Sequence, residues 1–208
     1  MADQIRRYFT SRDMARVSSR ACEGCGKCCR GMGDTVHVDP YDCFMLTKES
    51  GRPFSALLDC EIALHFEGGL MVPALRMDPD CAFLGADGRC QIHGARPGIC
   101  RLFPLGRDYK DGKVRYFLLE DACSEKARTK VRIDRWLGIP DISVYEEFKL
   151  DWHKFQVSLA GHLSKAAGSE TVRCSNLLVL KTFYLTPYRD FYPDFYGRLA
   201  HIKHVLNI

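Results

Sequence analysis

The chain has 208 residues, 46% of them hydrophobic, which suits one globular unit with a buried core. Its formal net charge of +4 is small, and its basic residues are mixed with acidic ones, so nothing indicates a nucleic-acid partner. No apolar run reaches the length of a membrane span, and residues 1–10 lack the apolar core of a signal peptide. We therefore expect a cytoplasmic protein that binds no membrane.

The first predicted element is an amphipathic helix over residues 3–20. Ile5, Phe9, Met14 and Val17 fall near one face of such a helix, with arginines between them. A glycine-rich loop that carries four cysteines follows this helix.

Asp39 and Pro40 predict the start of a second helix, with the aspartate as its cap and the proline in its first turn. Gly51 is a suitable stop, and Ser55 opens a further short helix. Paired apolar runs around short turns predict two β-hairpins, which turn at Gly68-Gly69 and at Asp111-Gly112, over residues 61–77 and 107–119.

The character of the chain changes near residue 125. Helical periodicity predicts three helices beyond that point, over residues 143–166, 175–186 and 193–206. We expect an α+β, mainly helical fold in one compact unit. A cysteine-rich metal-binding part with short hairpins (residues 1–125) would pack against a helical part (residues 126–208).

Eleven cysteines in a reducing compartment favour metal ligation or redox chemistry over a disulfide scaffold. Four of them fall within eight residues, and others follow in a turn-rich block. The candidate metal ligands are Cys22, Cys25, Cys28, Cys29, Cys81, Cys90, Cys100 and Cys123.

Cys22, Cys25 and Cys28 have the spacing that holds three corners of a four-iron cluster in ferredoxins, with a fourth ligand from elsewhere. Zinc ribbons instead use two separated pairs, and no second close pair occurs here. The spacing therefore favours an iron–sulfur cluster of the 4Fe-4S type and leaves zinc as the alternative. Cys29 is one thiol more than this loop requires, although eight thiols would fill two four-thiolate centres.

Cations flank these cysteines and could offset the charge of a cluster or bind an anionic substrate. His93 could be a metal ligand or could hydrogen-bond a backbone carbonyl. Together with the flanking cations it gives a second set of candidate residues around the cluster: Lys27, Arg30, His93, Arg96 and Arg101. The remaining cysteines of apolar stretches, Cys43, Cys60 and Cys174, are expected to be buried packing residues.

The run C-E-G-C-G-K-C-C and the later run C-A-F-L-G-A-D-G-R-C-Q-I-H-G-A-R-P-G-I-C-R-L-F-P resemble the CxxCxxCC, or YkgJ-like, cysteine-cluster family. That family is described as zinc- or iron-chelating, and often as iron–sulfur. The resemblance covers residues 20–125 and implies that the seven cysteines of the two runs bind metal, with Cys123 as a looser late member.

Flagellin lysine N-methylases carry a similar cysteine block. That weaker similarity implies a third possible function, methyl transfer to protein lysines with S-adenosylmethionine and a metal cluster. Their chains are longer, and no separate methyl-donor site is recognisable here. Whether the protein is an enzyme, and whether its partner is a redox protein or a protein substrate, stays open at this point.

Overall fold

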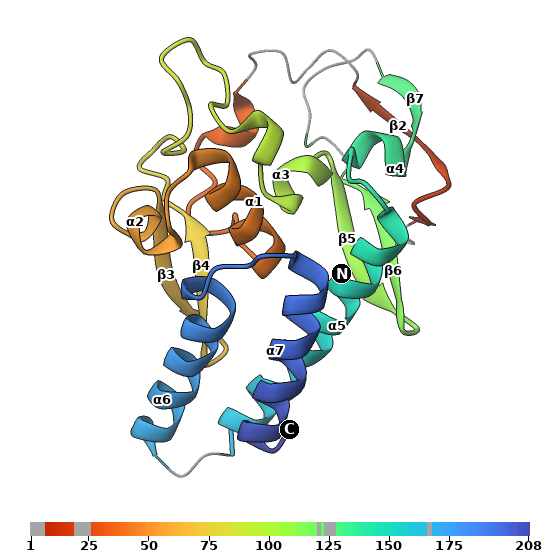
Figure 1. The fold of residues 1–208 in the computed structure, drawn as a ribbon. Helices are drawn as coiled ribbons and strands as arrows, with labels where there is room; N and C mark the ends of the chain where they lie inside the picture. Colours follow the sequence, from red (N-terminus) through yellow and green to blue (C-terminus); the bar gives the residue numbers. More distant parts are fainter. Residues whose placement is uncertain (1–6, 19–25, 120–121, 123–127, 166–167) are drawn as a thin grey trace, which may run out of the picture.

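The computed structural model describes residues 7–18, 26–119, 122, 128–165 and 168–208, and it shows the expected α+β, mainly helical fold (Figure 1). The strands are β1 (Tyr8–Phe9), β2 (Met14–Ser18), β3 (Ile62–Glu67), β4 (Leu70–Leu75), β5 (Leu105–Lys110), β6 (Lys113–Leu118) and β7 (Arg128–Arg132). The α-helices are α1 (Pro40–Ser50), α2 (Phe54–Leu58), α3 (Gly98–Leu102), α4 (Ile133–Leu137), α5 (Ile142–Leu163), α6 (Ser169–Leu180) and α7 (Phe191–Leu206). Shorter turns are η1 (Lys27–Cys29) and η2 (His93–Ala95), which are 3-10, and η3 (Lys181–Leu185), which is π-helical.

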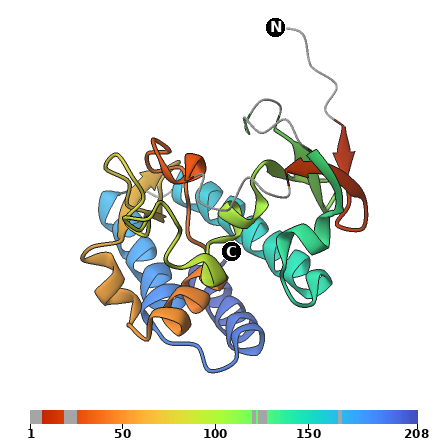
Figure 2. The same ribbon diagram turned by 90° about the horizontal axis from the view of Figure 1, so that it is seen from above.

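The described strands form three small antiparallel sheets. One has the order β1–β6–β5, and the others are the ribbons β2–β7 and β3–β4. Seen from above, β2–β7 and β1–β6–β5 lie at one side of the molecule, while α1, α2 and the β3–β4 ribbon lie with α6 and α7 at the other (Figure 2).

The first described residues are β-structure, so the helix predicted for residues 3–20 is wrong over residues 7–18. Ala15 and Val17 are buried and Arg16 is exposed, which is the two-residue period of a strand. Because β2 pairs with β7, a strand from a distant part of the chain, local spacing did not reveal it. Residues 3–6 and 19–20 of that prediction lie outside the described residues.

Both predicted hairpins are confirmed. Gly68 and Gly69, with φ of 57° and 84°, connect β3 to β4. Asp111 and Gly112, with φ of 53° and 67°, connect β5 to β6. A turn with two consecutive residues at positive φ has a twist that matches that of the paired strands. Glycine adopts positive φ readily, which explains its presence in both turns.

The predicted start and end of α1 are also confirmed. The side chain of Asp39 accepts a hydrogen bond from the Asp42 amide (2.9 Å), and the Asp42 side chain accepts one from the Asp39 amide (3.2 Å). This reciprocal capping box satisfies backbone N–H groups that the first turn of a helix leaves unpaired. Gly51 ends the helix in the left-handed region with φ of 66°, and the next helix, α2, begins at Phe54.

The C-terminal helices form the main part of the core. Phe148 of α5 contacts Phe191 and Phe195 of α7, with ring centroids 5.1 and 4.8 Å apart, so the aromatic-rich tail packs inside the protein. Asn176 joins α6 to the β3–β4 ribbon, because its side chain bonds Gly69 and Met71 backbone groups. Within the described ranges, no helix combines the length and apolarity needed to cross a bilayer.

A buried ion pair joins the start of α1 to the middle of α5. Lys149 Nζ donates to Asp39 Oδ2, and the two side chains are only 12% and 8% exposed. Both charges have left water, so removal of one partner leaves the other without compensation.

We predict that Lys149→Met lowers the free energy of unfolding by about 3 kcal/mol, because Asp39 would then be buried without its cation. The matched control is Lys154→Met on the same helix, whose 3.2 Å ion pair with Asp151 is 56% exposed on the lysine side. The control should lose less than about 0.5 kcal/mol. Urea denaturation measures both values, and equal losses in the two variants would contradict the structural role of the buried pair.

Candidate metal centre

The second half of the cysteine loop is shaped by Gly26. This residue has φ of 61°, and its carbonyl accepts the Cys29 amide at 3.0 Å. A Cβ at this position would lie 3.4 Å from the Gly88 carbonyl oxygen, so the two loops approach each other closely here. Glycine adopts such a conformation without steric cost, and the turn η1 then presents Cys28 and Cys29.

Main-chain hydrogen bonds attach this loop to the second cysteine block. The Cys81 amide donates to the Cys29 carbonyl (2.8 Å), and the Gly31 amide donates to the Pro79 carbonyl (3.0 Å). Arg30 Nε lies 4.0 Å from Asp80 Oδ2 on the same side of the junction. These bonds hold the loop without using any sulfur atom.

Cys81 and Cys90 stand at the two ends of a closed loop. The Leu84 amide donates to the Cys81 carbonyl at 2.8 Å, and Leu84 forms a β-bridge with Cys90. The predicted turn at Asp87-Gly88 is present, since Gly88 has φ of 75° and its amide donates to the Gly85 carbonyl at 2.9 Å. The turn therefore brings the backbone of Cys90 back to Leu84, next to the segment that carries Cys81 nine positions earlier in the sequence.

Cys100 comes from α3, whose position is fixed by Asp42. The Gly98 amide at the start of α3 donates to Asp42 Oδ1 at 2.8 Å. A Cβ on Gly98 would lie 2.3 Å from the Tyr145 hydroxyl oxygen, so only glycine fits. Through Asp42, the first helix therefore places the third segment of the cysteine site.

The described thiols of these segments act on one another electrostatically. A hydrogen bond from the Cys29 thiol lowers the pKa of Cys28, and the same bond, with burial, raises the pKa of Cys29. Burial also raises the pKa values of three further thiols, and charge on Cys28 adds to each of these increases: Cys81, Cys90 and Cys100. Cys28 is thus the thiol that most readily becomes a thiolate, with the other four around it.

Arg96 is the cation most closely associated with the thiols, because its charge lowers the pKa values of Cys28 and Cys90. It donates from Nη1 to Nε2 of His93 at 2.7 Å, and no described residue is a hydrogen-bond partner of its buried Nε. His93 is largely exposed. The part of its ring that is withdrawn from water, and then the Arg96 charge, lower its pKa. Arg101 instead holds the local backbone, since it donates to the carbonyls of Arg96 and Gly94.

Part of the predicted cysteine site lies outside the residues that the structure describes. Cys22, Cys25, Cys123 and the side chain of Lys27 lie outside the described residues. In the part of the chain that the structure does describe, no three His, Cys, Asp or Glu side chains are arranged so that they could hold a metal ion. The donors near the junction are cysteine sulfurs, a soft set that suits zinc or iron and not magnesium or calcium.

The other cysteines lie apart from this site. Cys43 is buried as expected, and its thiol donates to the Tyr184 carbonyl at 3.5 Å. The expectation of burial is wrong for Cys60 and Cys174, which are exposed at the end of α2 and on α6. Cys60 lies in the turn that follows α2, and Cys174 lies on the solvent-facing side of α6, positions that the apolar residues nearby did not reveal.

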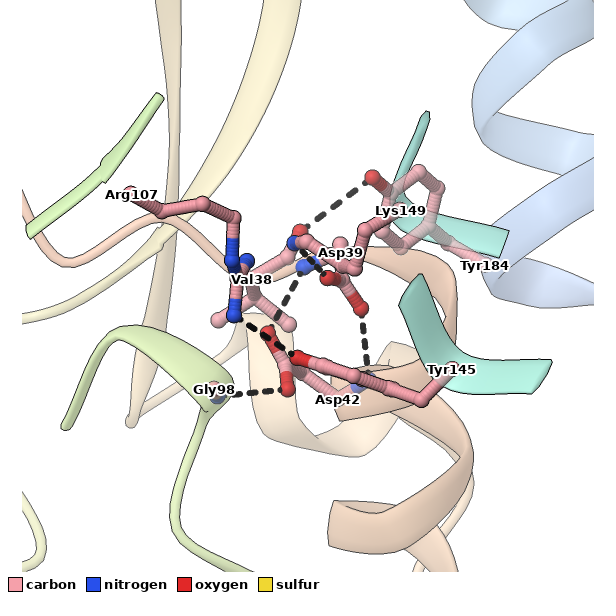
Figure 3. Close-up of polar contacts among 8 residues, drawn as sticks. All are labelled: Val38, Asp39, Asp42, Gly98, Arg107, Tyr145, Lys149 and Tyr184. Carbon is pink, nitrogen blue, oxygen red and sulfur yellow. Dashed lines mark hydrogen bonds and ion pairs between the residues drawn. The ribbon is translucent and has the colours of Figure 1, made fainter. Parts of the chain in front are cut away.

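Sequence reasoning missed a buried polar cluster beside the cysteine site, composed of Asp39, Asp42, Arg107 and Lys149 (Figure 3). Only Asp39 was identified, as a helix cap. Lys149 could have been found, because it lies four residues after Tyr145 and three before Trp152, on the buried face of α5. No sequence signal distinguishes Arg107 from the other arginines of the chain.

Cysteines on separate loops that main-chain hydrogen bonds join are the feature of a cysteine-cluster domain. A family model matches residues 21–124, half of the chain: it is CxxCxxCC, described as "Putative zinc- or iron-chelating domain". The chain belongs to this family, which confirms the resemblance of its two cysteine runs. No curated protein and no solved structure matched the chain.

Asp42 should make stability depend on pH between about 4 and 7. Burial, and then the charge of Asp39, raise its pKa from 3.8 to about 7. The folded protein therefore holds this proton more tightly than the unfolded chain does. The stability from this group is complete below its unfolded pKa and is lost as pH rises through its folded pKa.

We predict that the free energy of unfolding of the wild type, minus that of Asp42→Asn, falls steadily as pH rises from 4 to 7. The control is Asp134→Asn, because a hydrogen bond from Arg132 lowers the pKa of Asp134 and places its titration below this window. Urea denaturation at a series of pH values measures the difference. A difference that is constant for Asp42→Asn across the window would contradict the prediction.

Proposed function

We propose that this protein holds an iron–sulfur cluster between the cysteine loop of residues 22–29 and the cysteine block of residues 81–100. The observation that carries the proposal is the position of Cys28. Its charge acts on Cys81, Cys90 and Cys100, so donors from three separate segments share one electrostatic environment around it. Soft thiolates from several loops are the usual ligands of such clusters.

In the proposed arrangement, Cys22, Cys25 and Cys28 hold three corners of a four-iron cluster. The fourth ligand comes from the block, from Cys81, Cys90 or Cys100. The remaining thiols, with Cys29 and Cys123 among them, would suffice for a second centre. Residues 126–208 act as the helical support on which this metal-binding part, residues 1–125, is built.

The charges around the site support the same proposal. Thiolates around a cluster leave net negative charge, and nearby cations offset it and tune its reduction potential. Arg96 already acts on Cys28 and Cys90 in this way, and we place Lys27, Arg30, His93 and Arg101 in the same environment. The eight described cysteines are free thiols, which supports a reducing compartment such as the cytoplasm.

Anaerobic purification should give a brown protein with broad visible absorption, and acid-labile sulfide in equal amount to iron. About four irons per chain would indicate one centre, and about eight would indicate two. A colourless protein that contains zinc, without iron or sulfide, would overturn the iron–sulfur proposal. It would leave metal chelation by the family domain intact.

Substitution of single cysteines should separate ligands from bystanders. Cys28→Ser should lose most of the iron and the visible absorption, and the same loss in one of Cys81→Ser, Cys90→Ser and Cys100→Ser should identify the fourth ligand. Cys174→Ser should keep both, because Cys174 is exposed on α6 and bonds only to Glu170 among its described contacts. The measurement is iron per folded chain, with far-ultraviolet circular dichroism as the check on folding. Full iron content in Cys28→Ser would count against Cys28 as a ligand.

A structural zinc module is the alternative function, since the family description covers zinc as well as iron. Short hairpins and turns in residues 26–119 would then depend on the metal for their fold. Removal of zinc by a chelator would unfold this part of the chain, whereas a fold that persists without metal would exclude this version.

A further inference from the structure

A cavity of about 410 Å³ lies beside the cysteine site, between the first turn of α1, the ribbon β3–β4, strand β5 and helix α5. Its size is within the range of pockets that enclose small organic ligands. Most of its wall is apolar, with Leu70 and Met71 on one side and Trp152, Phe155 and Leu159 of α5 on another. The aspartate, arginine and lysine side chains of the wall form the cluster of Asp39, Asp42, Arg107 and Lys149, while His37, Tyr109, Gln156, Asn176 and Tyr184 add further polar groups.

Three members of that cluster are satisfied by the protein itself. Asp39 forms its ion pair with Lys149, so their charges cancel. The two oxygens of Asp42 accept the amides of Gly98 and Asp39. Tyr184 closes one side of the cluster by donating to the Val38 carbonyl at 3.2 Å (Figure 3).

Arg107 differs from the other three. Its Nη2 donates to the Tyr145 hydroxyl at 3.4 Å, and its guanidinium lies 5.5 Å from the centre of that ring. Its buried Nε has no hydrogen-bond partner among the described residues. No carboxylate of the described residues lies within ion-pair distance of it. A guanidinium stays charged at all relevant pH values, so this cavity wall carries one cation that no described carboxylate pairs with directly.

A charge withdrawn from water without a partner is costly, and the planar fork of arginine matches a carboxylate with two parallel hydrogen bonds. We propose that the cavity binds a monocarboxylate with an apolar chain, whose carboxylate is held by Arg107 and whose chain fills the apolar chamber. A single uncompensated cation balances a single negative charge. The second charge of a phosphate dianion would find no cation, because Lys149 is already paired with Asp39.

This binding site is distinct from the metal centre and does not depend on which metal the cysteines hold. The two sites share α3, because Ile99 and Leu102 line the cavity while Cys100 lies between them on the same helix. Carboxylate binding can therefore be tested on the full chain with whatever metal it retains, and the metal content serves as a check on the preparation.

The test is isothermal titration of the purified full-length protein with sodium decanoate. We expect saturable binding, at least tenfold weaker in Arg107→Met, whose side chain keeps the apolar stem and loses the charge. Arg107→Met should also keep or raise the melting temperature, because it removes a buried unpaired charge. The control Arg135→Met, at an exposed position on α4 outside the cavity, should bind decanoate as the wild type does.

Two further titrations identify the ligand class. In Val179→Phe the added ring occupies the apolar chamber, so decanoate binding should fall at least tenfold although Arg107 is intact. 1-Decanol, which has the chain without the charge, should bind the wild type at least tenfold more weakly than decanoate. The proposal is overturned if the wild type shows no saturable binding, if Arg107→Met binds decanoate as tightly, or if decanol or decyl phosphate binds more tightly than decanoate.

Discussion

The arrangement of the whole molecule depends on the first turn of α1, where one aspartate has two structural roles. Asp39 caps α1 through the Asp42 amide and also holds the buried ammonium of Lys149 on α5. Asp42 closes the capping box and accepts the Gly98 amide, so α3 is attached to the same turn. Three elements from distant parts of the sequence are thus fixed relative to one another within a single buried hydrogen-bonded network. In a low-dielectric interior these bonds are strong, and leaving any of them unmade is correspondingly costly.

The cysteine site depends on this network, but its sulfurs take little part in it. Cys100 reaches the junction because Asp42 holds α3, and Cys81 reaches it because its amide bonds the Cys29 carbonyl. Main-chain hydrogen bonds therefore position the described loops, and the thiols remain available as ligands. Burial raises the pKa values of Cys81, Cys90 and Cys100, and charge on Cys28 raises them further, so it is costly for several of these thiols to be thiolates together. A bound metal would remove that cost, since it stabilises the deprotonated sulfurs.

Sequence patterns predicted the parts of the fold that local chemistry decides. Asp39-Pro40 and Gly51 bounded α1, and two paired turns marked the hairpins, because capping and positive φ act within a few residues. The β2–β7 ribbon was missed, because its stability comes from a partner that no local window contains. The residues of the candidate sites likewise include some that local sequence reveals and some that only the tertiary fold reveals. The cysteines were visible by spacing, whereas Arg107 was not, since only the tertiary fold removes it from water.

Lys149 and Arg107 are two buried cations with different roles: one stabilises the fold, and the other is available to bind a ligand. Both lie next to the same cavity, and both are held near Tyr145 and the start of α1. Lys149 is matched by Asp39 and so contributes to the fold, as breaking such a pair costs several kcal/mol. Arg107 forms no ion pair with any described carboxylate, and its Nη2 donates to the Tyr145 hydroxyl, whose pKa is raised by burial, so this neutral partner does not balance its charge. Stability alone would favour an apolar residue at position 107. The charge of Arg107 is therefore better explained by binding of an anionic ligand in the cavity than by a structural role.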